Sequence, residues 1–225
     1  MNMTVPAPPT TTDLLRQHVG PDRHATRRTG TERGASPREG ERLRPLSRLQ
    51  LEDRLQELGD FYAEASGGGP WAWNQARDAF LRRLAADVRR PGFELLVAET
   101  TELTGCAYGF PARADGPAWE GPDAHLPGKL LRLAASGRLF VVRGILVPPR
   151  VRRQNQGRAW NLARRMQRRL LTDHGAVTGV TLVRRSDRAT VEALRSWGWR
   201  YVRGDSPQES RALLRSPFRV LVLGT

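Results

Sequence analysis

Apolar residues recur along this chain of 225 residues with two different spacings, and each spacing predicts one kind of element. A spacing of three and four residues is typical of helices, whereas short apolar runs between turn residues are typical of strands. Helices are predicted at 47–65, 74–90, 129–135, 159–172 and 187–197. Strands are predicted at 43–46, 93–98, 103–110, 139–147, 177–183, 199–202 and 217–223.

The order of these elements predicts the fold class. The two strands between 93 and 110 give a hairpin signal, and two later helices connect strands as crossovers. We therefore expect an α/β (α+β) fold with a mixed, mostly antiparallel central sheet of six to seven strands and helices on both faces.

The N-terminal stretch differs in composition from the rest. Residues 1–40 contain no Phe, Trp, Tyr or Ile, so they lack the apolar surface that would offset the entropy of ordering. We expect a disordered tail over 1–40 and one domain over 41–225. Within that domain, residues 111–137 form a long insertion between strands, and connections of this length tend to be functional or loose.

Charge changes sign along the predicted domain. Residues 41–120 hold 10 basic and 13 acidic groups, a net of −3, whereas residues 121–225 hold 21 basic and 6 acidic groups, a net of +15. Such a basic half attracts phosphates, either of a cofactor or of a nucleic acid.

Other compositional features narrow the class of protein. Cys106 is the single cysteine, which excludes an internal disulfide and a cysteine-based metal cluster, and its apolar surroundings predict a buried structural thiol. No pair of His and carboxylate residues has metal-ligand spacing, so no metal is expected. No apolar run approaches the roughly 18 residues that span a bilayer, and no signal segment is recognised, so we expect a cytoplasmic protein without a membrane partner.

The stretch from Leu139 to Leu171 concentrates the chemistry. An apolar strand is followed by an Arg-rich loop and then by a helix, and backbone N–H groups at a helix start favour anions. Gly144, in the middle of the strand, predicts a bulge. This order predicts a site for a phosphate-bearing ligand.

This stretch resembles the signature of the GNAT acyltransferase superfamily, which has Gln or Arg, two residues, Gly, one residue, and Gly or Ala. Gln154, Gly157 and Ala159 satisfy it, and a second register would use Arg152, Asn155 and Gly157. Helix phase favours the first register, because it leaves one coherent apolar stripe on the following helix. That stripe is Leu162, Ala163, Met166 and Leu170.

The resemblance extends over roughly residues 41–225. The strand at 43–46 and the helix after it are similar to the opening elements of the family, and the segment 187–199 resembles its second signature, which ends in Gly198-Trp199. Trp71 and Trp73 would line the acceptor pocket by this resemblance, and packing over the sheet is the alternative.

The resemblance implies an N-acyltransferase, most simply an N-acetyltransferase, that uses acetyl-CoA or another acyl-CoA as co-substrate. Loop amides would hold the pyrophosphate, the strand backbone would pair with the pantetheine arm, and an N–H near Leu146 would stabilise the oxyanion. The implied cofactor-binding residues are Ile145, Leu146, Val147, Arg152, Arg153, Gln154, Asn155, Gln156, Gly157, Arg158, Ala159 and Asp187.

Two positions depart from the family pattern. The tyrosine that often acts as general acid falls at Leu194, and the strand position that often carries a base falls at Arg143. The catalytic residues therefore stay unknown. Four side chains have the chemical type to act as general acid or general base instead. The alternative is that the protein positions the two substrates and a water relay transfers the proton. The four are Glu99, Glu102, Tyr108 and Tyr201.

Three hypotheses for function remain open. The leading one is transfer of an acyl group to an amine of a small molecule or peptide. The second is a GNAT-like transferase that uses or modifies aminoacyl-tRNA, which the basic C-terminal half and the arginines opposite the apolar stripe suggest. The third is a non-catalytic domain that binds CoA or a partner. The sequence leaves the acceptor, the acyl length and the choice between monomer and homodimer undetermined.

Overall fold

The computed structural model describes residues 41–67, 69–113, 126–149 and 161–224, all of which belong to one compact unit that begins at Pro37. The tail predicted at 1–40 and residues 114–125 of the 111–137 insertion lie outside these ranges, so the tail and the insertion remain predictions. None of the helices described has the length and apolar character that crossing a membrane requires.

Seven strands of the described residues form one sheet in the order β1-β2-β3-β4-β5-β7-β6. Neighbouring strands run antiparallel except β4 and β5, which are parallel. The predicted mixed, mostly antiparallel sheet is therefore confirmed. The strands are β1 Arg42–Pro45, β2 Glu94–Glu99, β3 Leu103–Pro111, β4 Leu139–Leu146, β5 Thr178–Arg184, β6 Arg200–Tyr201 and β7 Phe218–Gly224.

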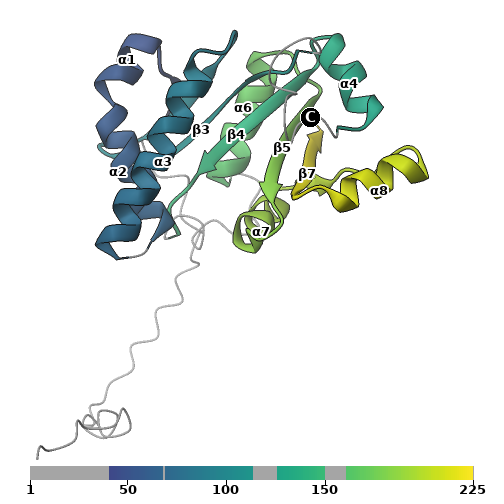
Figure 1. Cartoon of the computed structure of the whole chain (residues 1–225). Helices are drawn as coiled ribbons and strands as arrows, with labels where there is room; N and C mark the ends of the chain where they lie inside the picture. The colour runs from purple at the N-terminus through teal and green to yellow at the C-terminus, as the bar shows by residue number, and fades with distance from the viewer. Residues whose placement is uncertain (1–40, 68, 114–125, 150–160, 225) are drawn as a thin grey trace, which may run out of the picture. The chain divides into compact units, whose positions relative to one another are not determined.

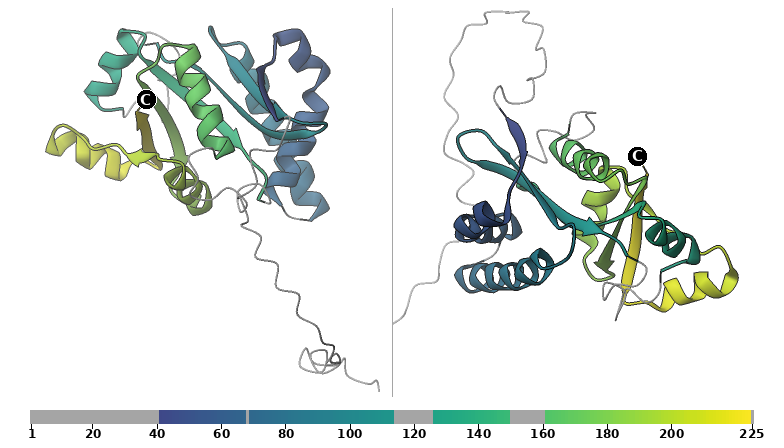
Figure 2. Two further views of the ribbon diagram at one scale, coloured as in Figure 1. Left: turned by 180° about the vertical axis from the view of Figure 1, so that it is seen from behind. Right: turned by 90° about the horizontal axis from the view of Figure 1, so that it is seen from above.

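Helices cover both faces of this sheet (Figures 1 and 2). Helices α1 to α3 cover one face over β1 to β3, and α4 covers the same face over β4 and β5. Helices α6 and α7 cover the opposite face. The helices are α1 Arg48–Asp53, α2 Leu55–Ser66, α3 Pro70–Val88, α4 Gly128–Ala135, α6 Leu162–Asp173, α7 Arg188–Ser196 and α8 Pro207–Arg215.

The prediction of one helix over 47–65 is wrong, because the helix is interrupted at Arg54. Ser47 caps the first part as expected, since its side chain accepts a hydrogen bond from the Gln50 amide. At Arg54 the backbone leaves the helical region, with φ −108° and ψ 7°. The Arg54 guanidinium donates to Glu57 and, 45 residues away on β2, to Glu99. These ion pairs hold the interruption against the sheet.

Helix α3 begins at Pro70, earlier than the predicted Asn74, because proline at the first helical position is already arranged for a helix. This start places Trp71 in the first turn with 74% of its surface exposed. Packing of Trp71 over the sheet is therefore wrong. Trp73 is half-buried, beside the guanidinium of Arg77.

Helix α8 was not predicted from the sequence. None of its residues is buried, and its aliphatic side chains are three consecutive residues, Ala212 to Leu214, which give no repeat at helical spacing. Its start nevertheless carries a local signal, because Ser206 accepts from the Glu209 amide and Pro207 follows the cap. The Glu209 carboxylate also accepts from the backbone of Gly128, which ties α8 to the start of α4.

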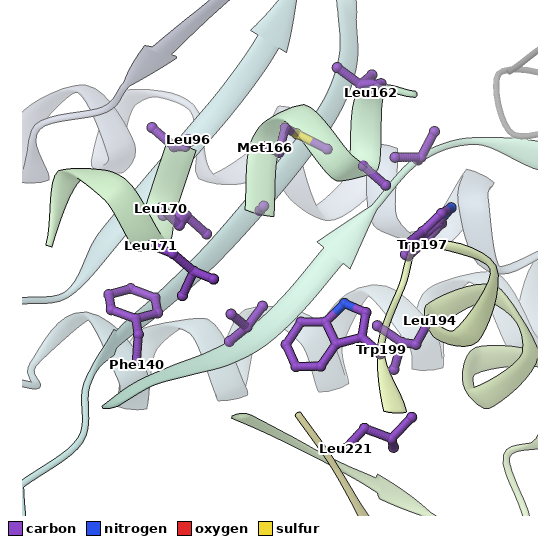
Figure 3. Close-up of a cluster of buried hydrophobic side chains, with 14 of the residues drawn as sticks. Leu96, Phe140, Leu162, Met166, Leu170, Leu171, Leu194, Trp197, Trp199 and Leu221 are labelled. Carbon is purple, nitrogen blue, oxygen red and sulfur yellow. The ribbon is translucent and has the colours of Figure 1, made fainter. Parts of the chain in front are cut away.

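The predicted stripe of α6 is confirmed as the centre of the larger core cluster (Figure 3). Leu162, Ala163, Met166 and Leu170 are all at most 1% exposed. They pack with residues of α7 and of the strands on this face, among them Trp199. The register that puts Gln154, Gly157 and Ala159 in the signature depends on this helix phase, although those three residues lie outside the described ranges.

A buried amide joins α6 to the segment after α7. Gln167 accepts a hydrogen bond from the Trp199 indole at 2.9 Å and donates to the carbonyl of Trp197 at 2.9 Å. Gly198 between the two tryptophans has a φ of 104°, which favours glycine. This geometry explains why a Gly-aromatic pair ends the second signature segment.

Gln167→Ala is expected to lower the free energy of unfolding by about 2 to 4 kcal/mol, because it removes two buried hydrogen bonds. Urea unfolding followed by tryptophan fluorescence measures the change. Gln208→Ala, on the exposed side of α8, is the matched control and should change stability by less than about 0.5 kcal/mol. Equal effects of the two substitutions would contradict the role of Gln167.

Candidate functional site

The two parallel strands separate halfway along β4 (Figure 1). Leu139–Val141 of β4 pairs with Thr178–Val180 of β5, and no later pairing joins these strands in the described residues. β4 continues to pair with β3 as far as Leu146. The edge of β4 that faces β5 is thus left without a strand partner over its second half.

A bulge in β4 lies where the strands separate. Tyr108 of β3 is opposite Gly144, but Gly109 is opposite Val142, so Arg143 is the extra residue. The predicted bulge at Gly144 is confirmed, and β4 and β5 pair only before it in the described residues.

Two glycines allow β3 and β4 to lie close together next to the bulge. A Cβ at Gly144 would lie 2.5 Å from Cε1 of Tyr108. A Cβ at Gly109 would lie 2.0 Å from the carbonyl oxygen of Val141. Both positions therefore require glycine for steric reasons and not for backbone flexibility.

The predicted cofactor residues of β4 lie on this separated half. Leu146 and Val147 are buried and Ile145 is half-buried. Strand backbone with an open edge offers N–H and C=O groups at regular spacing to an extended ligand. The roles predicted for these three residues remain predictions.

The helix start beyond the loop is capped by the protein itself. Asn161, which the sequence reading missed, accepts hydrogen bonds from the amides of Ala163 and Arg164 at 3.0 and 3.4 Å. An Asn directly before an apolar-periodic segment is the signal that would have identified this cap. The predicted pyrophosphate residues Arg152–Ala159 precede it and lie outside the described ranges. A bound pyrophosphate would therefore depend on amides upstream of Ala163.

Asp187 caps α7, because its carboxylate accepts from the amide of Thr190 at 3.0 Å. It follows the end of β5 at Arg184, the end at which β4 and β5 have separated. The predicted contact of Asp187 with a cofactor remains a prediction.

The position of the family tyrosine is a core position in this chain. Leu194 is 5% exposed and packs in the cluster of α6 and α7. The structure thus agrees with the inference that this position supplies no general acid.

Arg143, at the bulge, is paired with a buried carboxylate that the sequence reading missed. Its Nε lies 3.2 Å from Asp87 of α3, whose side chain is 3% exposed and also lies 3.4 Å from Nε of Arg90. Two guanidinium groups thus compensate the buried charge. Asp87 follows Phe80 and Leu84 at helical spacing, so a carboxylate on the buried stripe of α3 was the available signal.

Of the four substitutes by chemical type, only Tyr108 lies at the bulge. Burial raises the pKa of Tyr108, and the nearby Asp87 carboxylate raises it further, so the phenol stays protonated. Burial disfavours the charge of Glu99, but hydrogen bonds from Arg44 and Arg54 outweigh burial and lower its pKa.

The other two substitutes are also remote from the bulge. Glu102 is exposed in the turn between β2 and β3. Tyr201 is on the edge strand β6, where its hydroxyl accepts from Arg219.

Cys106 is the buried structural thiol that the sequence predicts. It is fully buried on β3, and burial raises its pKa from 9.0 to about 12. Such a thiol is a poor nucleophile at neutral pH.

The free energy of unfolding is expected to fall as the pH rises from 9 toward 12. The thiol of the unfolded chain ionises near its ordinary pKa of 9.0, whereas folded Cys106 keeps its proton up to about 12. The slope from this residue approaches about 1.4 kcal/mol per pH unit. Urea unfolding at a series of pH values measures it. Cys106→Ala should lack this slope between pH 9 and 10, and an unchanged slope would contradict the assignment.

The arginines opposite the apolar stripe of α6 mostly have partners within the chain. Arg164 donates to the carbonyl of Ser196, and Arg165 donates to Glu41. Arg168 is exposed. The role of this face in binding nucleic acid remains a prediction.

No set of three or more His, Cys, Asp or Glu side chains is placed to hold a metal ion in the parts of the chain that the structure describes.

Comparison with solved structures shows a likeness of fold. No protein-family model matches the chain, and no curated protein matches it in sequence. The PH1933 protein of Pyrococcus horikoshii OT3 is similar over 82% of this chain and 98% of its own, with 14% identity and a TM-score of 0.50.

Two further solved structures carry functional names. A putative GNAT-family acetyltransferase of Desulfovibrio desulfuricans is similar over 82% of this chain and 98% of its own, with 13% identity and a TM-score of 0.48. The PaiA N-acetyltransferase of Thermoplasma acidophilum, in complex with coenzyme A, is similar over 82% and 99%, with 8% identity and a TM-score of 0.47. At such identities the likeness is one of fold alone.

Proposed function

We propose that this chain is an acyl-CoA-dependent N-acyltransferase, most simply an N-acetyltransferase, that acts on an amine of a small molecule or peptide. The observation that carries the proposal is the separation of β4 from β5 at a bulge. This geometry leaves a strand edge open in the middle of a sheet, where a neighbouring strand would otherwise cover it.

The open edge fits an extended ligand with amide groups. The pantetheine arm of CoA is such a ligand. Ile145 to Val147 would pair with those amides in the manner of an added strand. Acyl-CoA would supply the acyl group as a thioester. The backbone N–H of Leu146 would hold the negative charge that develops on the carbonyl oxygen when an amine attacks. Arg152, Arg153 and Arg158 supply positive charge in the loop predicted for the pyrophosphate.

Within this proposal Tyr108 is the candidate proton donor. Its phenol is protonated at neutral pH, and its ring lies against Gly144 at the bulge. Tyr108→Phe keeps the ring and removes the hydroxyl. A general acid contributes about 100-fold or more to a rate, so kcat should fall by that order while the affinity for acetyl-CoA stays unchanged.

Isothermal titration of the full chain with acetyl-CoA tests the proposal. We expect saturable binding of one molecule per chain at micromolar concentrations, followed by release of free CoA thiol with a member of a panel of amines. No binding at high micromolar concentrations would overturn the proposal. Binding without turnover of any amine would favour a non-catalytic CoA-binding domain, which the buried Leu194 and the paired Arg143 also suggest.

A second candidate is a transferase that uses or modifies aminoacyl-tRNA, because residues 121–225 carry 21 basic and 6 acidic groups. Phosphate contacts would make such binding steeply dependent on salt. A gel shift with bulk tRNA at low and physiological salt tests it. No shift at low salt would discard this candidate.

A further inference from the structure

We infer that a hollow between α4 and the strand β6 binds a small organic anion that has an apolar body. The hollow has a volume of about 730 Å³. This value lies within the range of roughly 300 to 1,000 Å³ that is usual for sites of small molecules. The inference does not depend on the proposed acyltransferase activity.

The charged side chains around the hollow are all basic. Lys129 and Arg132 line it from α4, and Arg200 and Arg203 line it from β6 and the residues that follow. No Asp or Glu is among the described residues that line it. Among the described residues, Asp205 is the only carboxylate paired with one of these four cations. It lies 3.1 Å from Nζ of Lys129.

Three of these cations are available to a ligand. Lys129 is already engaged, because it also donates to the carbonyl of Arg203 at 2.9 Å. Arg132, Arg200 and Arg203 are exposed, and their side chains form no hydrogen bond or ion pair with another described residue. Guanidinium groups bind carboxylate and phosphate groups with paired hydrogen bonds.

The floor of the hollow is apolar. Leu130, Leu133, Val202 and Val222 line it and belong to, or pack against, the core cluster beneath α4. An inorganic anion would leave the apolar floor exposed to water. A cation would be repelled by the arginines. An anionic group joined to an aliphatic or aromatic body matches both the rim and the floor.

The hollow lies apart from the separated strands. It reaches Thr178, the first residue of β5, which pairs with Leu139 where β4 and β5 are still joined. The bulge at Arg143 lies beyond the other end of this pairing. None of the described residues that line the hollow belongs to the bulge or to the separated half of β4.

Isothermal titration of the full chain with sodium octanoate tests the inference, with n-octylamine and inorganic phosphate as matched probes. Saturating CoA is present throughout, so that an acyl site is filled if the chain has one. We expect octanoate to bind one molecule per chain and both other probes to bind at least tenfold more weakly. Equal binding of n-octylamine or of phosphate would overturn the inference.

Substitutions locate the binding. Arg132→Ala combined with Arg200→Ala should weaken octanoate at least tenfold. Arg168→Ala, which removes an exposed arginine of α6 on the opposite face, should leave it unchanged. Circular dichroism establishes that each variant is folded. We expect all of them to fold, because the substituted residues are exposed. Unchanged binding by the double variant, or equal weakening by Arg168→Ala, would refute the assignment to this hollow.

Discussion

Gly109→Ala is expected to lower the free energy of unfolding by about 3 kcal/mol, the upper part of the usual range for overpacking. The added Cβ would lie 2.0 Å from the Val141 oxygen and 2.6 Å from Cε1 of Phe140. The oxygen belongs to the backbone of β4, so it can move only if the pairing of β3 and β4 changes. Urea unfolding followed by circular dichroism measures the effect.

Gly224→Ala is the matched control for Gly109→Ala. Gly224 also lies in a strand, but an added Cβ would meet nothing within 4 Å. We expect a change of less than about 0.5 kcal/mol there. Equal losses of stability in the two variants would show that contact with the Val141 oxygen is not the reason for glycine at position 109.

Gly144→Ala is expected to cost about 2 kcal/mol, for a related but separable reason. Its Cβ would lie 2.5 Å from Cε1 and 3.1 Å from Cζ of Tyr108, so the obstacle is a side chain and not the backbone. The ring is 3% exposed and has little room to move. A smaller residue at 108 should therefore relieve the strain.

The double variant Tyr108→Leu with Gly144→Ala tests this reasoning. We expect its loss of stability to be smaller than the sum of the two single losses by at least about 1 kcal/mol, as is usual for residues in direct contact. Strictly additive losses would show that the ring is not the obstacle. Tyr108→Leu with Gly109→Ala is the control pair, since no side-chain substitution at 108 removes a contact with the Val141 carbonyl.

Local patterns predicted much of the fold. The stripe of α6, the hairpin of β2 and β3 and the bulge at Gly144 each depend on residues close together in sequence, and each was found. The capping residues Asn161 and Ser206 also had local signals, which were missed.

Contacts between distant residues could not be predicted in the same way. The pair of Asp87 and Arg143 joins residues 56 positions apart, and the interruption at Arg54 depends on Glu99 of another element. Each sequence segment taken alone is consistent with an uninterrupted helix or strand, so only the folded chain reveals these pairs. The loop Arg152–Ala159 lies outside the described residues, and its role rests on the sequence resemblance.

The short pairing of β4 with β5 gives the sheet two leaves, β1 to β4 and β5 to β7, joined along only three residue pairs in the described chain. Helix α6 packs chiefly on the first leaf, against β2, β3 and β4. Substitutions beneath α6 would therefore move the first leaf, and with it change the width of the gap between β4 and β5. Under the proposed acyltransferase function, such variants are expected to differ in acyl-chain preference.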